Sequence, residues 1–196
     1  MPSLGERGGR RFSQAISEGD GISVLVEVAT PDAAQAAESD GAEALVVTGH
    51  AEGVREATEL PILWRGGGDV DAAARAGADA YLIVAEELAD DDGERLREAA
   101  AHVVELGLDW VVSVGDEEEL ARVLERHDPE IFHLAGTDLE HALELLTDVP
   151  AGKLAIAEAT TVTRPQVLEL ERAGIDAVIV IAGDVAELVG GAPPAV

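Results

Sequence analysis

Short apolar runs recur along the chain, and each is followed by a stretch with helical periodicity. The apolar runs predict eight strands, at residues 22–28, 44–47, 62–65, 80–84, 110–114, 131–134, 154–157 and 177–181. The stretches after them predict eight helices, at residues 31–38, 51–58, 70–76, 93–106, 117–126, 139–146, 165–172 and 184–189. Apolar runs this continuous suit parallel strands that are covered on both faces, with the helices as crossovers between them.

A short motif marks the start of four of these strands. Gly41, Gly77, Gly107 and Gly174 each follow a helical stretch, and an acidic residue stands two positions after each glycine. Glycine at this place suits the left-handed conformation that ends many helices. The glycines lie 36, 30 and 67 residues apart, the last interval being close to two units, so the motif indicates a repeated strand-plus-helix unit.

This alternation predicts a single-domain (β/α)8 TIM barrel at residues 10–196, with a short helix near residues 10–18 before its first strand. The Gly-rich residues 1–9 are expected to be flexible. With 196 residues the barrel would be unusually short, because about 250 is typical. An open doubly wound sheet is the alternative, but such sheets usually carry a Gly-rich phosphate loop after the first strand, and Val28-Ala29-Thr30-Pro31 is not one.

The charge of the chain is strongly acidic. It has 40 Asp and Glu against 13 Lys and Arg, a net charge of −27, and Lys153 is its single lysine. Such a field repels phosphate backbones and anionic lipids, so we expect neither nucleic acid nor membrane as a partner, and a small-molecule ligand is left open. The acid excess is typical of halophilic proteins in cytoplasm with molar salt, where the Debye length is about 3 Å.

Two further absences in the sequence exclude cysteine chemistry and membrane-directed segments. Without cysteine there is no disulfide, thiol nucleophile or cysteine metal site. No apolar run approaches the roughly 20 residues of a membrane span, and the N-terminus lacks a hydrophobic signal core. We therefore expect a cytoplasmic protein, and the sequence leaves its oligomeric state open.

In a TIM barrel the chemistry lies at the C-terminal ends of the strands. Three charged residues, Glu27, Arg65 and Glu158, end apolar strands, where an unpaired charge would be costly to bury. We expect them to meet in the barrel mouth as a Glu-Arg-Glu cluster. Two interpretations stay open: a structural ion-pair network, or a general acid or base beside an arginine that holds a substrate carboxylate or phosphate.

The other strand ends give weaker signals. His50 and His133 could titrate near neutrality, but they have no clear spacing to acidic residues, so we predict no metal site and no cofactor. Gly66-Gly67-Gly68 forms a flexible loop after the third strand and is a weak phosphate cradle, because no helix-opening lysine or Ser/Thr pattern follows. Whether this loop becomes ordered on binding is open.

Several segments resemble strand-end motifs of the indole-3-glycerol-phosphate synthase family, a tryptophan-pathway barrel that closes and decarboxylates a carboxyphenylamino-deoxyribulose phosphate. They are residues 26–31 (VEVATP), 61–67 (PILWRGG), 111–120 (VVSVGDEEEL), 134–139 (LAGTDL), 156–161 (IAEATT) and 173–181 (AGIDAVIVI). The resemblance runs from about Phe12 to Asp184, and it implies a carbon-carbon lyase on a (β/α)8 fold.

The resemblance also implies roles for individual residues. Glu27 and Glu158 fall on acidic active-site positions, and Arg65 falls on the family's catalytic lysine, so these three are the candidate catalytic residues. The candidate substrate-binding residues stand at other strand ends: Ser113, His133, Thr137, Thr160 and Gly183.

Several of these positions depart from the family pattern. Ala29 stands for a lysine, Ser113 for a glutamate and Thr137 for an arginine, and the phosphate-binding loops are altered. Arginine does not easily release a proton, because its pKa exceeds about 12. Loss of one positioned acid typically lowers the rate about 10²- to 10⁴-fold. Two interpretations therefore stay open. The chain is an enzyme, either a diverged synthase-like lyase or another small-molecule barrel enzyme built on Glu27, Arg65 and Glu158. Alternatively it is a non-catalytic relative, a binding or interaction module or minimal scaffold whose mouth is held by ion pairs.

Overall fold

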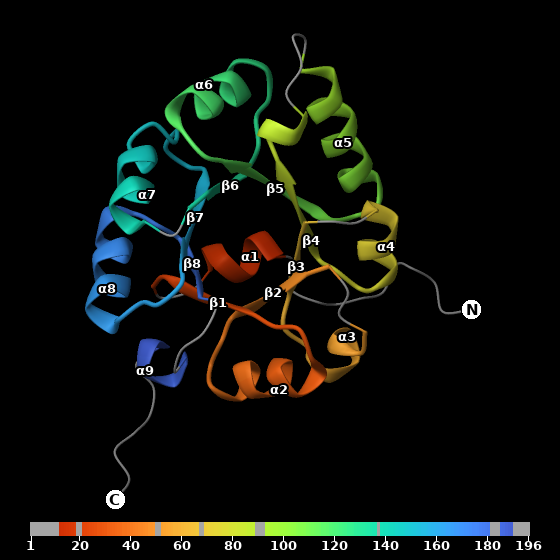
Figure 1. Cartoon of the computed structure of the whole chain (residues 1–196), viewed down its shortest axis with the longest axis vertical. Helices are drawn as coiled ribbons and strands as arrows, with labels where there is room; N and C mark the ends of the chain where they lie inside the picture. The colour runs from red at the N-terminus through yellow and green to blue at the C-terminus, as the bar shows by residue number, and fades with distance from the viewer. Residues whose placement is uncertain are drawn as a thin grey trace, which may run out of the picture.

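Eight parallel strands close into a barrel in the order β1 to β8, as the computed structural model of the chain shows (Figure 1). The structure describes residues 12–18, 21–49, 52–66, 69–88, 93–136, 138–180 and 185–189. The strands are β1 Ser23–Glu27, β2 Ala44–Thr48, β3 Ile62–Arg65, β4 Ala80–Val84, β5 Asp109–Val114, β6 Ile131–Leu134, β7 Leu154–Ala159 and β8 Ala177–Val180. The predicted short, single-domain (β/α)8 barrel is confirmed.

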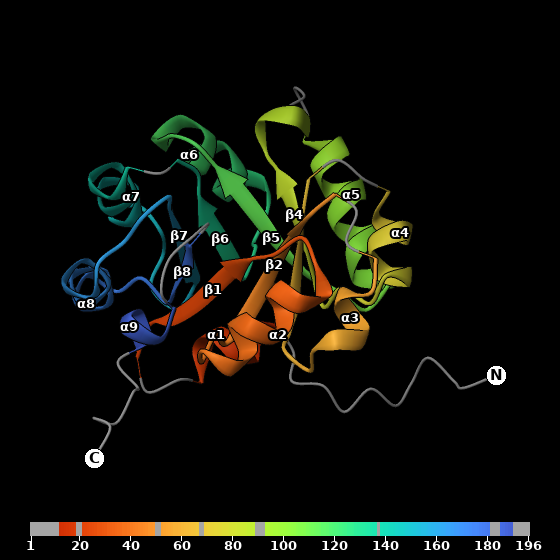
Figure 2. The same ribbon diagram turned by 60° about the horizontal axis from the view of Figure 1, so that its bottom comes forward.

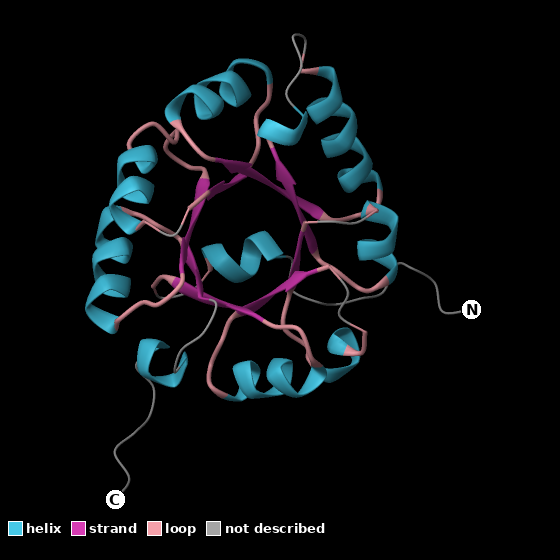
Figure 3. Ribbon diagram, in the orientation of Figure 1, coloured by secondary structure: helices cyan, strands magenta, loops and turns pink. Residues whose placement is uncertain are grey.

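Helices surround the barrel on its outer side (Figure 3). They are α2 Pro31–Ser39, α3 Val54–Ala57, α4 Val70–Arg75, α5 Glu94–Glu105, α6 Glu117–Arg126, α7 Leu139–Leu146, α8 Arg164–Ala173 and α9 Val185–Val189. A short 3-10 helix, η1 Glu86–Leu88, follows β4. None of the described helices is both long enough and apolar enough to cross a membrane.

The repeated glycine motif has the predicted backbone. Gly41, Gly77, Gly107 and Gly174 all have positive φ angles, between 76° and 102°, which only glycine adopts without strain. In two of the four copies the acid that follows binds a backbone amide of a neighbouring strand. The carboxylate of Asp79 accepts from Ile62 at the start of β3 (2.9 Å), and that of Asp176 accepts from Ala155 in β7 (2.8 Å). In these two copies the motif therefore both ends a helix and fixes the start of a neighbouring strand.

The leading helix, α1 Phe12–Ser17, lies inside the ring of strands when the barrel is viewed along its axis (Figure 1). Phe12 and Ile16 are fully buried there, against inward-facing residues of the strands. The backbone amide of Ser13 donates to Asp109 at the start of β5 (2.8 Å), so α1 closes the end where the strands begin, as Figure 2 shows from the side. The sequence predicted this helix but not its place.

Two local predictions were imprecise. The helix predicted at residues 51–58 is only α3 within the described residues, because Gly53 adopts a left-handed conformation (φ 81°) immediately before it and Thr58 after it is extended. β7 continues two residues beyond its predicted end, to Ala159, so that it includes Glu158. Glu158 is therefore held by a strand rather than by a loop.

Candidate functional site

The three predicted charges meet at the C-terminal end of the barrel. Arg65 donates from Nη1 to Oε2 of Glu158 (2.6 Å) and from Nη2 to Oε2 of Glu27 (3.0 Å). The side chains are 19%, 11% and 23% exposed respectively, so the cluster is largely shielded from water. The expected Glu-Arg-Glu arrangement is confirmed, and the guanidinium group bridges two carboxylates that come from different sides of the barrel.

Three more side chains extend this cluster. Nε2 of His133 lies 3.2 Å from Oε2 of Glu158, and Nδ1 of His133 lies 2.9 Å from Oγ of Ser113. At the other end, the hydroxyl of Thr48 donates to Oε1 of Glu27 (2.8 Å). Six side chains from six strands thus form one continuous mouth network, in the order Thr48, Glu27, Arg65, Glu158, His133 and Ser113.

The alternation of side chains along a strand explains why these residues converge. Successive residues of a strand point to opposite faces, so every second residue faces the barrel interior. In β7, Ile156 faces inward and Glu158 is the next residue to do so; in β3, Leu63 precedes Arg65 in the same way. The inward-facing positions are apolar deeper in the barrel, and on β1, β2, β3, β5, β6 and β7 they become polar at its open end. The network therefore forms the top layer of the barrel interior.

The hydrogen bond with His133 has a definite direction. A carboxylate only accepts hydrogen bonds, so Nε2 of His133 must carry a proton to bind Glu158. When the imidazole is neutral, its Nδ1 is then an acceptor, and Ser113 donates to it. Both Ser113 and His133 are buried, and each has a partner in the network. Burial of these polar groups is thereby compensated.

The charge of the network is negative. The hydrogen bond from His133 and the positive charge of Arg65 hold the pKa of Glu158 below its usual value, although burial acts in the opposite direction. Glu158 is therefore ionised at neutral pH. Two carboxylates against one guanidinium leave the cluster with about one net negative charge when His133 is neutral.

Of the remaining candidate substrate-binding residues, the structure describes Thr160. Thr160 is exposed just beyond β7, and within the described part of the chain no hydrogen bond joins its side chain to the network. Thr137, Gly183 and His50 lie outside the described residues, as do Gly67 and Gly68 of the third loop. Their predicted roles stay predictions. Across the ranges that the structure describes, no group of three or more His, Asp or Glu side chains is arranged to hold a metal ion.

The sequence did not assign Thr48 to the site, nor did it pair Ser113 with His133. A signal was present, because each of these residues follows an inward-facing apolar residue by two positions in its strand: Val46, Val111 and Ile131 respectively. That spacing places them in the same top layer as Glu158. Which members of the layer touch depends on the stagger of the strands around the barrel, which the sequence does not show.

Comparisons with known proteins give a consistent result. The family model described as indole-3-glycerol phosphate synthase matches residues 54–184, a range that includes Arg65 and Glu158. An indole-3-glycerol phosphate synthase of Rhodopirellula baltica is 35% identical over 141 residues, which cover 65% of this chain and 52% of that protein. One from a Geobacillus species is 28% identical over 168 residues, covering 75% and 64%. The chain therefore spans between about half and two thirds of the length of these curated relatives.

Solved structures share the fold at low sequence identity. An N-acetylmannosamine-6-phosphate 2-epimerase from Clostridium perfringens superimposes with a TM-score of 0.67 at 16% identity, covering 86% of this chain and 89% of that one. A thiamine phosphate pyrophosphorylase from Pyrococcus furiosus has a TM-score of 0.62 at 18% identity, covering 86% and 94%. At this level of identity the likeness concerns the fold alone.

Proposed function

The chain belongs to the indole-3-glycerol phosphate synthase family, and from this premise we propose that it is a non-catalytic member whose barrel mouth is held by ion pairs. It then serves as a binding module on a stable barrel, rather than as a carbon-carbon lyase of tryptophan biosynthesis. The observation that carries this proposal is the double ion pair of Arg65, which engages Glu27 and Glu158 at the same time.

The first supporting point concerns proton transfer. A general acid works best when its pKa lies near the working pH. Arg65 stands at the position of the family's catalytic lysine, but a guanidinium holds its proton at any ordinary pH. Glu158 has a lowered pKa, so it carries no proton to donate near neutrality. Neither residue therefore suits the role of general acid in this pairing.

The second supporting point concerns substrate charge. The family's substrate carries a phosphate dianion, and the mouth network has more negative than positive charge. The whole chain, at −27, adds to this repulsion. Binding would also require a substrate to displace a carboxylate from Arg65 and leave that carboxylate without a partner, which is costly at a largely buried site.

A second candidate function is retained lyase activity. It is favoured by one observation: Glu27 and Glu158 keep acidic residues at the two positions that the family resemblance assigns to active-site acids. In that case Arg65 would bind the substrate carboxylate, and Glu158 would exchange protons during ring closure.

An activity assay distinguishes these functions. Purified wild-type protein and the Glu158→Gln variant are incubated in molar KCl with the carboxyphenylamino-deoxyribulose phosphate, and indoleglycerol phosphate is measured. A synthase of the family that is active in this salt serves as the positive control. We expect equal background product from both preparations, since host synthase contaminates them equally. Product that depends on Glu158 would overturn the proposal and support the lyase.

A further inference from the structure

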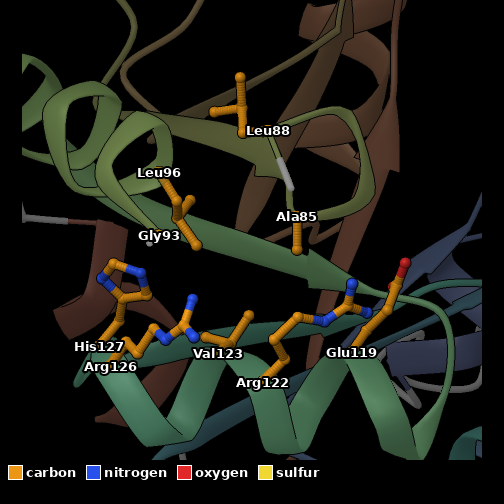
Figure 4. Close-up of a pocket in the computed structure, with 9 residues that line it drawn as sticks. All are labelled: Ala85, Leu88, Gly93, Leu96, Glu119, Arg122, Val123, Arg126 and His127. Atoms are coloured by element: carbon orange, nitrogen blue, oxygen red, sulfur yellow. The ribbon is translucent and has the colours of Figure 1, made fainter. Parts of the chain in front are cut away.

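Helix α5 has different contacts on its two flanks. Toward α6, Leu96 and Val123 are buried in the apolar core and line a narrow hollow (Figure 4). On the other flank, α5 lies beside α4 on the outer side of the barrel (Figure 1). There a polar contact joins the two helices, in which Nε2 of His102 on α5 lies 3.0 Å from Oδ2 of Asp71 on α4. This contact shares no residue with the mouth network, so its role is independent of the proposed function.

Carboxylates face both nitrogens of the His102 ring. Nε2 is bound to Asp71, and Nδ1 lies 4.0 Å from Oε2 of Glu105, one turn further along α5. An ionised carboxylate only accepts hydrogen bonds, and a neutral imidazole carries a single N–H. Neutral His102 would therefore turn a lone pair toward one of the two carboxylates, whereas the imidazolium form offers an N–H to each. The geometry suits the protonated ring.

Three further charged groups act on this contact: Asp69 and Arg75 from the α4 side and Glu105 from α5. Asp69 caps the start of α4, where its carboxylate accepts from the backbone amide of Asp71 (3.1 Å) and pairs with Arg75 (3.7 Å). The hydrogen bond to Asp71 raises the pKa of His102 above its ordinary value of 6.5, and the charges of Asp71, Glu105 and Asp69 act in the same direction. The hydrogen bond from His102 in turn lowers the pKa of Asp71 below its ordinary value of 3.8. Each partner thus favours the charged form of the other.

We propose that His102 is a pH-operated link between α4 and α5, which holds the two helices together when its ring carries two protons and loosens when the ring is neutral. Asp71 lies in the first turn of α4, so the link holds the start of that helix. Because the pKa of His102 is raised in the folded protein, the contribution is complete below pH 6.5 and is lost as the pH rises through the raised pKa. It is also lost when the pH falls through the lowered pKa of Asp71. The link is therefore closed in mildly acidic solution and open in alkaline solution.

Titration of the His102 ring, followed by NMR in the full chain at constant KCl, tests the contact. We expect the pKa of His102 to be lower in Asp71→Asn than in wild type, because the variant removes the negative charge that faces Nε2. Asp32→Asn is the matched control, since Asp32 is an exposed acid in the first turn of α2 and its replacement should leave the pKa of His102 unchanged. Equal pKa values of His102 in wild type and Asp71→Asn would overturn the proposal.

Amide hydrogen exchange tests whether the contact holds α4. The backbone amide of Ala73 donates to the carbonyl oxygen of Asp69 (3.1 Å), so its exchange reports opening of the first turn. The ratio of exchange rates between His102→Gln and wild type cancels the intrinsic pH dependence of exchange. We expect this ratio to be at least about twofold larger below pH 6.5 than at a pH where His102 is neutral. The His102 side chain is 45% exposed, so the fold should survive its replacement. A ratio that does not change with pH would overturn the proposal.

Discussion

Arg65 and Glu158 are 93 residues apart in the chain, and Nη1 of Arg65 lies 2.6 Å from Oε2 of Glu158. The two residues belong to β3 and β7, which are not neighbours in the barrel, so this ion pair spans its open end. Arg65 also holds Glu27 on β1, and Glu158 also binds His133 on β6. The strand ends are thus linked to one another across the mouth as well as along the sheet.

The Ser113 end of the network is open to a simple test. In Ser113→Ala, Nδ1 of buried His133 loses its hydrogen-bond partner, which should lower the free energy of unfolding by about 1 to 2 kcal/mol. Urea unfolding followed by circular dichroism measures this change. The control is Ser39→Ala, at an exposed position of α2, which should stay within about 0.5 kcal/mol. Equal effects of the two substitutions would show that the Ser113 contact contributes nothing.

Stability should depend on pH through Glu158. The pKa of Glu158 is lower in the folded protein than its ordinary value of 4.5. Its ionised carboxylate therefore stabilises the fold fully above pH 4.5, and this contribution is lost as the pH falls through the pKa of the folded protein. The stability difference between wild type and Glu158→Gln should therefore be largest near pH 7 and shrink on acidification. Urea unfolding of both proteins, from near pH 7 to acidic pH, measures this stability difference.

Asp176 provides the opposite case for this measurement. Burial raises the pKa of Asp176 in the folded protein. Above that pKa the buried charge lowers the free energy of unfolding, and this destabilisation disappears as the pH falls and the carboxylate is protonated. Relative to Asp176→Asn, the wild type should therefore gain stability on acidification. For Glu158, a stability difference between wild type and Glu158→Gln that is constant with pH, or that grows toward low pH, would contradict the assignment of a lowered pKa.

The helix inside the barrel makes a prediction about packing. Phe12 of α1 is fully buried among inward-facing strand residues, so Phe12→Ala should lower the free energy of unfolding by about 3 to 5 kcal/mol. The control is Val104→Ala, because Val104 is 58% exposed and its truncation should cost less than about 0.5 kcal/mol. If Phe12→Ala behaves like the control, α1 does not stabilise the barrel.

Salt should stabilise this acidic chain. Its net charge of −27 produces self-repulsion, and molar KCl reduces the Debye length to about 3 Å. We expect the Tm to rise by at least about 5 °C between low and molar KCl, since about 2 to 4 °C corresponds to 1 kcal/mol at this size. Sucrose of equal osmolality controls for effects other than screening. A Tm that does not respond to KCl beyond the sucrose effect would refute the role of charge screening.

The barrel was predictable because strand-plus-helix units repeat along the sequence, and several of them carry a glycine at the same place. The sequence also predicted the meeting of Glu27, Arg65 and Glu158, because buried charges at strand ends require partners. The place of α1 was not predictable, since a six-residue helix can bury its apolar residues on either side of a barrel.

The most direct test of a structural mouth network is the stability of Glu158→Gln near neutral pH. The substitution removes the charge that pairs with Arg65 and accepts the hydrogen bond of His133, so we expect the free energy of unfolding to fall by about 2 to 4 kcal/mol. Glu94→Gln is the matched control, because Glu94 forms an exposed ion pair with Arg97, and it should cost less than about 1 kcal/mol. A Glu158→Gln variant as stable as the control, or more stable than wild type, would contradict the structural role of the network.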